Sequence, residues 1–169
     1  MTETKMPVRS VRTAVSTDEE ELMVMCRMLH EENGLFPMSE DRVRRVLRMA
    51  FDGLGGVLGV IGNPGKIEAM IYMLISQIWH SDEWHLDELF SYCRPEYRKS
   101  NNAKRLIQFA KDCSDELHLP LVIGIISNTR TEEKIRLYQR QLSKPNGCFF
   151  VYNTKWNGSD KAQVDAKTN

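Results

Sequence analysis

Apolar and polar residues follow a helical spacing in the first third of the chain. Between residues 17 and 51 the apolar side chains recur three or four positions apart, which is typical of helices with one buried face. The stretch 17–20 resembles a capping box followed by acidic residues, and it predicts a helix that ends near residues 33–34. A second helix is expected from Ser39, which is a suitable N-cap, to about Phe51.

Strand patterns flank these helices. Val8 to Val15 alternates as a first strand would, and a turn at residues 62–65 predicts a hairpin. Leu121–Ile126 is a continuous apolar run, which predicts a strand buried on both faces. The later strands are expected at Val57–Ile61, Ile67–Trp79, Glu83–Cys93, Leu121–Ile126 and Cys148–Tyr152, and the later helices at residues 102–117 and 131–142.

The order of these elements is β-α-α-β-β-β-α-β-α-β. Strands that are joined first as hairpins and then by helical crossovers predict an α/β fold, with one mixed, mostly antiparallel sheet and helices on both faces. The length suits a single domain, which we place at residues 8–152. Residues 1–7 are expected to form a flexible N-terminus and residues 153–169 a polar, disordered tail.

Charge and composition argue against several classes of function. The 169 residues carry 23 basic and 23 acidic side chains, so the net charge is zero, which argues against general affinity for nucleic acids or membrane surfaces. No apolar run reaches transmembrane length and the N-terminus has no signal-peptide core, so we expect a cytoplasmic protein. The four cysteines are scattered without a CxxC pair, and we expect no metal site.

The most informative stretch, residues 86–106, reads as a strand, a turn at a proline, a basic loop and the start of a helix. Small or polar residues from Ser100 to Ala103 leave backbone N–H groups accessible at the helix start, which is where anions bind. A polyphosphate would find both hydrogen-bond donors and positive charge here. The cationic side chains are Arg94, Arg98, Lys99, Lys104 and Arg105.

Residues 95–98 (Pro-Glu-Tyr-Arg), followed by residues 99–103, resemble the pyrophosphate loop of the GNAT superfamily of acetyl-CoA-dependent N-acetyltransferases. That loop usually reads Pro-x-Tyr-Arg and then Arg/Gln-x-x-Gly-x-Gly/Ala, so Arg98 fits the first basic position and Ala103 the last small one. Asn101 stands where the family has a glycine, and Asn tolerates unusual backbone angles well. The element order also matches this family, and the loop resembles short members encoded by phages and prophages.

The resemblance implies acetyl-CoA as a co-substrate, held by backbone groups of the fourth strand and by the basic loop. Without the resemblance, the same residues would read as a buried strand that leads into a basic surface loop. The residues that the resemblance assigns to the cofactor are Ser91, Tyr92, Cys93, Arg98, Lys99, Ser100, Asn101, Asn102, Ala103, Lys104 and Asn128.

Tyr138 is the candidate acid, because residues 135–140 resemble the helix after the fifth strand, where many GNAT enzymes place a tyrosine that protonates the leaving sulfur. A core aromatic is the alternative. The candidate bases are Asp87 and Glu88, which are adjacent and would face opposite sides of a regular strand. In histone-acetylating GNAT enzymes a Glu lies six residues before the end of the pantetheine strand, and by this resemblance the position is Asp87. A β-bulge would favour Glu88 instead, and either could be a solvated side chain.

The acceptor pocket is expected where the first two helices meet. Glu31, Glu32 and Phe36 lie there, and two carboxylates beside an aromatic ring suit a cationic amine; a solvated helix end is the alternative. The favoured function is acetyl transfer to a primary amine by direct attack in a ternary complex. The alternative is a GNAT-fold binding protein with little or no activity, for example one encoded by a phage that acts on a host protein or nucleotide in the host cytoplasm. The oligomeric state is left open, and a homodimer is one alternative.

Overall fold

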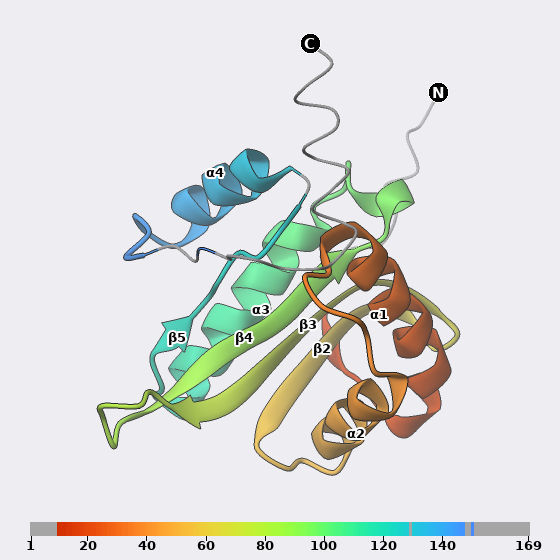
Figure 1. The fold of residues 1–169 in the computed structure, drawn as a ribbon, viewed down its shortest axis with the longest axis horizontal. Coiled ribbons are helices and arrows are strands. Elements are labelled where there is room, and N and C mark those ends of the chain that lie inside the picture. Colours follow the sequence, from red (N-terminus) through yellow and green to blue (C-terminus); the bar gives the residue numbers. More distant parts are fainter. Residues whose placement is uncertain (1–9, 129, 148–149, 151–169) are drawn as a thin grey trace.

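The computed structural model describes residues 10–128, 130–147 and 150, and it contains a sheet with helices on both faces (Figure 1). The predicted α/β class and the predicted element order are confirmed as far as the last helix. The strands are β1 (Arg12–Thr13), β2 (Gly56–Asn63), β3 (Lys66–Gln77), β4 (Trp84–Cys93) and β5 (Leu121–Val122). The helices are α1 (Glu19–Asn33), α2 (Glu40–Phe51), α3 (Asn102–Leu117) and α4 (Thr131–Gln141), with short 3₁₀ turns η1 (Ser16–Asp18) and η2 (Pro95–Tyr97).

The sheet has the order β1-β2-β3-β4-β5, as expected from hairpins followed by one helical crossover. The pairs β1–β2, β2–β3 and β3–β4 are antiparallel, and β5 is parallel to β4. The long β2–β3 and β3–β4 hairpins form its centre. Among the described residues, β4 is therefore the last long strand of the sheet, and its outer edge pairs only with the two residues of β5.

Two apolar layers hold the helices against the sheet. Helices α1 and α2 pack on one face and α3 on the other, because side chains alternate between the faces along β2 and β3 (Figure 1). The layer under α1 and α2 includes Leu22, Met23, Met25, Leu47, Val60, Met70, Tyr72 and Tyr92. The layer under α3 includes Ile61, Ala69, Ile71, Met73, Leu86, Leu106 and Ala110.

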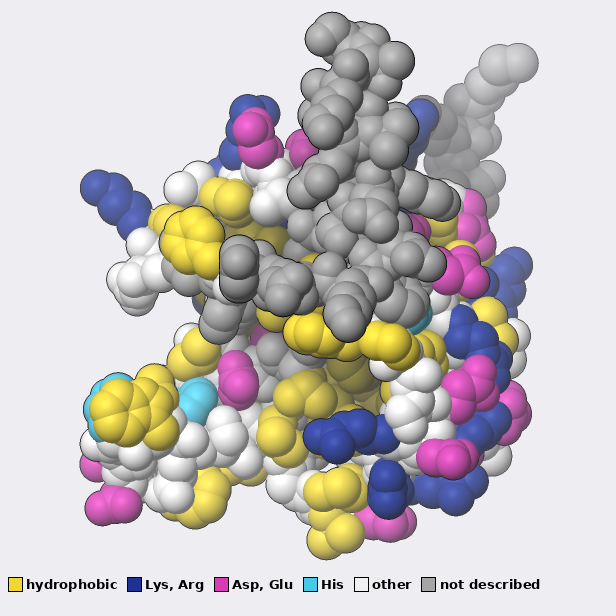
Figure 2. Space-filling view, in the orientation of Figure 1, with side chains coloured by type: hydrophobic (Ala, Val, Ile, Leu, Met, Phe, Trp, Pro, Cys, Tyr) yellow, Lys and Arg dark blue, Asp and Glu magenta, His cyan; other side chains and the backbone are white. Residues whose placement is uncertain are grey.

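Charged residues of both signs alternate over the outer surface of α1 and α2 (Figure 2). Arg44 pairs with Glu19 at 2.8 Å and with Glu20 at 2.6 Å, and Arg48 also pairs with Glu19. These pairs link the two helices side by side. No helix in the described residues is both long enough and apolar enough to cross a membrane.

The C-terminal part of the sheet differs from the prediction. The expected strand Leu121–Ile126 is paired only at its first two residues, and it is not buried on both faces: Val122 is 48% and Ile126 is 54% exposed. The physical reason is that the chain leaves β4 after residue 122, so the rest of the apolar run pairs with no strand in the part of the chain that the structure describes. The expected strand at residues 148–152, except Phe150, lies outside the described residues, as do residues 1–7 and 153–169.

Candidate active site

β4 and β5 are paired over two residues and then separate. The parallel ladder joins residues 86–87 of β4 to residues 121–122 of β5. Beyond that point β4 continues to Cys93 beside β3, and no other strand in the described part of the chain lies along its outer edge. Within the described residues, the outer side of the second half of β4 has no strand partner, and we call it the open edge.

Backbone groups at the end of β4 point to this open edge. The Arg94 N–H donates to the carbonyl of Glu68 on β3 at 3.0 Å, so the backbone of residue 94 faces β3. Because successive residues of a strand bond to alternate sides, Cys93 and Ser91 face the open edge. The Cys93 carbonyl accepts a hydrogen bond from Arg98 Nε at 3.1 Å, which agrees with this direction. An extended ligand could hydrogen-bond along this edge as a strand would.

A β-bulge in β4 brings Glu88 and Ser91 to one face of the sheet. Two successive residues of β3 pair with Phe90 and Glu88, so Leu89 is the extra residue. Residues three positions apart in a regular strand point to opposite faces, and one extra residue reverses that relationship. Both side chains accordingly reach Tyr138 of α4.

The side chains of Tyr138, Ser91 and Glu88 form one cluster beside the open edge. The Tyr138 hydroxyl lies 3.1 Å from Ser91 Oγ and 3.5 Å from Glu88 Oε1. Burial raises the pKa of Glu88 to about 7, although hydrogen bonds from Ser91 and Tyr138 lower it; the charge of Asp87 adds to the rise and that of Lys134 opposes it. Burial, together with the charge of Glu88, also raises the pKa of Tyr138. The cluster therefore combines a carboxyl that titrates near neutrality with a phenol that keeps its proton.

The two candidate bases lie in different surroundings. Asp87 is opposite Leu74 of β3, a residue that packs with the layer under α1 and α2. Glu88, by contrast, is hydrogen-bonded within the Tyr138 cluster on the other side of the strand. The sequence left the two carboxylates as alternatives, and the structure brings Glu88 to the candidate acid.

The amino end of α3 carries free donors and positive charge. Among the described residues, the N–H groups of Asn101, Ala103 and Lys104 have no hydrogen-bond partner, as expected at the start of a helix. The N–H of Asn102 is different, because Ser100 Oγ accepts from it at 3.1 Å. Lys99 and Lys104 are exposed. The Asn102 side chain is buried and donates to Glu68 Oε2 at 3.1 Å, so it serves the packing of α3 against β3.

Arg98 is directed at the end of α1. Its Nη2 lies 2.5 and 2.7 Å from the two carboxylate oxygens of Glu32, and its guanidinium lies 5.6 Å from the centre of the Tyr92 ring. The Tyr92 hydroxyl donates to the same carboxylate at 2.9 Å. Three residues that the sequence assigned to the cofactor or the acceptor thus form one ion-paired cluster with each other.

The end of α1 is also joined to the segment that leads from β5 to α4. Asn128 Nδ2 donates to the carbonyl of Gly34 at 3.3 Å, and Ser127 Oγ donates to Asn33 Oδ1 at 2.8 Å. Lys134 Nζ donates to Ser127 Oγ at 2.6 Å, and burial lowers the pKa of this lysine. The sequence reasoning missed Lys134, although its position four residues before Tyr138 places both side chains on one face of α4.

The remaining acceptor candidates lie at the surface. Glu31 is exposed, and Phe36 is 65% exposed while its carbonyl is 2.7 Å from His30 Nε2.

Burial raises the pKa of the Cys93 thiol to about 11, so this cysteine is protonated at neutral pH and is a poor nucleophile. In the described part of the chain, no three His, Cys, Asp or Glu side chains lie close enough to hold a metal ion.

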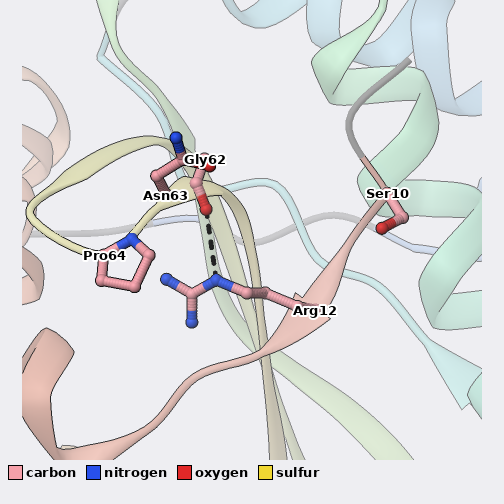
Figure 3. Close-up of a pocket in the computed structure, with 5 residues that line it drawn as sticks. All are labelled: Ser10, Arg12, Gly62, Asn63 and Pro64. Carbon is pink, nitrogen blue, oxygen red and sulfur yellow. Dashed lines mark hydrogen bonds between the residues drawn. The ribbon is translucent and has the colours of Figure 1, made fainter. Parts of the chain in front are cut away.

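A separate pocket lies at the opposite edge of the sheet (Figure 3). It is formed where β1 meets the β2–β3 turn, and Arg12 Nε donates there to the carbonyl of Gly62 at 3.2 Å. The Arg12 guanidinium also pairs with the buried Asp18 at 2.7 Å, so this arginine holds β1 to the start of α1. The pocket has no part in the cluster around Tyr138. Its lining residues are Ser10, Arg12, Gly62, Asn63 and Pro64.

No family model matches the chain, and no curated protein matches its sequence. Several solved structures, however, are similar to this chain in fold. A predicted acetyltransferase from Clostridium acetobutylicum, solved with acetyl-CoA, is 14% identical with a TM-score of 0.67, over 85% of this chain and 95% of that one. AAC(6')-Iy in complex with the bisubstrate analog CoA-S-monomethyl-acetylneamine is 12% identical with a TM-score of 0.65, over 87% and 98% of the two chains.

A GNAT family acetyltransferase from Staphylococcus aureus is 16% identical with a TM-score of 0.59, over 85% of this chain and 96% of that one. At these identities the likeness shows a shared fold. The chain therefore has the fold of the GNAT acetyltransferases over most of its length, as its sequence motif predicted.

Proposed function

We propose that this protein transfers the acetyl group of acetyl-CoA to a primary amine, by direct attack of the amine on the thioester in a ternary complex. The observation that carries the proposal is the position of the Tyr138–Ser91–Glu88 cluster at the open edge of β4. There an acid and a base lie beside backbone donors that can polarise a thioester carbonyl. The fold shared with structures bound to acetyl-CoA or a CoA analog supports the same reading.

In this proposal the cofactor spans the open edge and the start of α3. The pantetheine arm hydrogen-bonds to the backbone of Ser91 and Cys93, and the pyrophosphate binds the N–H groups of Asn101, Ala103 and Lys104. Lys99 and Lys104 supply positive charge beside those donors. The residues present fit the ligand, because these N–H groups have no partner among the described residues.

The proposed chemistry assigns a different task to each ionisable group. Glu88 removes a proton from the attacking ammonium, which suits a carboxyl whose pKa burial raises to about 7. Tyr138 donates a proton to the departing CoA thiolate. No covalent intermediate with the protein is involved, which agrees with the raised pKa of the Cys93 thiol. Glu31, Glu32 and Phe36 at the end of α1 are proposed to face the acceptor amine.

A second candidate is a binding protein that retains the fold and turns over slowly or not at all. The observation that favours it is the ion pair between Arg98 and Glu32. Arg98 Nη2 contacts both carboxylate oxygens of Glu32, so the pair competes with a phosphate for Arg98 and with an ammonium group for Glu32.

Two measurements separate the candidates. A rise in melting temperature with acetyl-CoA, together with thiol release on addition of a panel of primary amines and polyamines, supports the acetyltransferase. A rise in melting temperature without thiol release for any amine supports the binding protein. Unchanged melting at millimolar acetyl-CoA contradicts the acetyltransferase, because acetyl transfer requires the cofactor to bind.

A further inference from the structure

Ser91 holds the candidate acid and the candidate base together. Its Oγ lies 3.1 Å from the Tyr138 hydroxyl, and the bulge in β4 places it on the same face as the Glu88 carboxylate, whose pKa it lowers. The Tyr138 hydroxyl itself lies 3.5 Å from Glu88 Oε1, at the limit of a hydrogen bond. Ser91 thus provides the shorter of the two connections between the phenol and the rest of the cluster.

The β-bulge makes this arrangement possible. In a regular strand Glu88 and Ser91 would lie on opposite faces, and the extra residue Leu89 places both toward α4. Because Ser91 and Glu88 share this face, the Ser91 hydroxyl lies on the same side of the strand as both the carboxylate and Tyr138. A hydroxyl can both donate and accept, which is what a group between a phenol and a carboxylate has to do.

We infer that Ser91 is a positioning residue that joins Glu88 and Tyr138 into a proton relay, through which a proton taken from the amine reaches the CoA thiolate. The inference deepens the proposed function and rests on it. The base and the acid would then work as one unit, and each turnover would restore both to their starting protonation states without exchange with solvent at Tyr138.

The protons balance as follows. The ammonium gives one proton to the Glu88 carboxylate, and the free amine attacks the thioester carbon. The carbon–sulfur bond breaks, the sulfur leaves with the electron pair, and the thiolate takes the hydroxyl proton of Tyr138. The Tyr138 phenolate recovers a proton from the Glu88 carboxylic acid through the Ser91 hydroxyl. The nitrogen loses its second proton to solvent, so the products are the amide, CoA thiol and one released proton.

The charged and titratable groups around Glu88 come from two elements. Asp87 adjoins it on β4 and raises its pKa, whereas Lys134 and Tyr138 of α4 lower it. Ser91 carries no charge, so Ser91→Ala removes one hydrogen bond and leaves every charge in place. The matched control is Ser76→Ala on β3, because the Ser76 hydroxyl contacts His85 and lies outside the cluster.

The first test needs no turnover. The Glu88 carboxyl is titrated by carbon-13 NMR in the free protein, in the wild type and in both serine variants. We expect Ser91→Ala to raise the Glu88 pKa by about 1 to 2, the effect of one lost hydrogen bond to the charged form, and Ser76→Ala to leave it unchanged. A Glu88 titration that Ser91→Ala does not move overturns the inference, even if the protein is an active acetyltransferase.

The second test measures turnover. We expect Ser91→Ala to lower kcat about 10-fold, with acetyl-CoA affinity nearly unchanged and the acid limb of the rate–pH profile moved to higher pH. The double variant Ser91→Ala/Tyr138→Phe should be no slower than Tyr138→Phe alone, because both changes break one relay. Rate losses that multiply would contradict the relay. If the wild type does not bind acetyl-CoA at all, the proposed function fails and the relay fails with it.

Discussion

Arg98 is bound to Glu32 through both oxygens of the carboxylate, at 2.5 and 2.7 Å. The pair connects the turn after β4 to the last turn of α1, and each side chain is 26% exposed. The sequence motif suggested that Arg98 binds pyrophosphate, whereas in the structure its guanidinium has a protein partner. This contact shifts the proposed phosphate site from Arg98 to the N–H groups and lysines at the start of α3.

We expect Arg98→Glu to destabilise the protein in the absence of any ligand. The substitution removes a partly buried ion pair and places two carboxylates together, so it should cost about 2 kcal/mol or more of unfolding free energy. Chemical denaturation checks this, with Lys99→Glu as the control because Lys99 is exposed. An Arg98→Glu protein as stable as the Lys99→Glu protein would show that the Arg98–Glu32 pair contributes nothing.

Lys104→Glu should weaken acetyl-CoA binding about 10-fold, because a carboxylate in the first turn of α3 would repel the pyrophosphate. Lys104 is exposed, so folding should be unaffected. Lys111→Glu is the matched control, since it makes the same charge change two turns further along the same helix. Calorimetry measures the acetyl-CoA affinity of both variants. An equal loss of affinity in the two would contradict a phosphate site at the start of α3.

The sequence predicted the fold well because its signals were local. Ser39 illustrates this: its hydroxyl accepts from the Arg42 N–H at 3.4 Å at the start of α2, as expected of an N-cap. The separation of β4 from β5 was not visible in the apolar run 121–126, because pairing between strands depends on residues distant in the sequence.

The site was predicted only in part, because some of its residues are marked by local motifs and others meet only through contacts between distant parts of the chain. Tyr138 was found from a pattern on its own helix, but the sequence could not say which strand residue it would meet. The Leu89 bulge decides that Glu88, not Asp87, lies with Ser91 and Tyr138, and no local motif marks a bulge. The partner of Arg98 lies 66 positions away in the chain, so the pair with Glu32 could not be inferred from the basic loop.

Glu88→Gln should stabilise the protein at alkaline pH. The folded pKa of Glu88 is raised to about 7, above the value of about 4.3 expected in the unfolded chain. Between these values the folded state binds more protons than the unfolded state, so stability falls as pH rises through this range. The melting temperature of the glutamine variant relative to the wild type should therefore rise from pH 5 to pH 8. Glu116→Gln, at an exposed site on α3, should show no such trend.

The same substitution should change the rate–pH profile. We expect Glu88→Gln to lose rate at neutral pH and to recover part of it as pH rises, because the acceptor amine then loses its proton without a base. Asp87→Asn should keep the acid limb and move it slightly to lower pH, because the charge of Asp87 adds to the raised pKa of Glu88. Wild-type profiles in both variants would place the base elsewhere, or would show that the acceptor needs none.

Tyr138→Phe should lower turnover by roughly 100-fold, the usual range for a positioned acid, while acetyl-CoA affinity stays within a few-fold. The phenylalanine keeps the ring and its packing and removes only the hydroxyl that contacts Ser91 and Glu88. Stopped-flow thiol release and calorimetry give the two quantities. Undiminished turnover would assign Tyr138 to packing and the acid role to water. A variant that loses both acetyl-CoA affinity and its fold would show that Tyr138 is a structural residue.

The central claim is that acetyl-CoA binds along the open edge of β4 and at the start of α3. An NMR titration of the nitrogen-15-labelled protein with acetyl-CoA tests it most directly, because every amide reports separately. We predict saturable shifts for the N–H groups of Ser91, Cys93, Ala103 and Lys104, and none for Gly62 in the pocket at the opposite edge of the sheet (Figure 3). Shifts at Gly62 alone, or no saturable shift at millimolar acetyl-CoA, would contradict the claim.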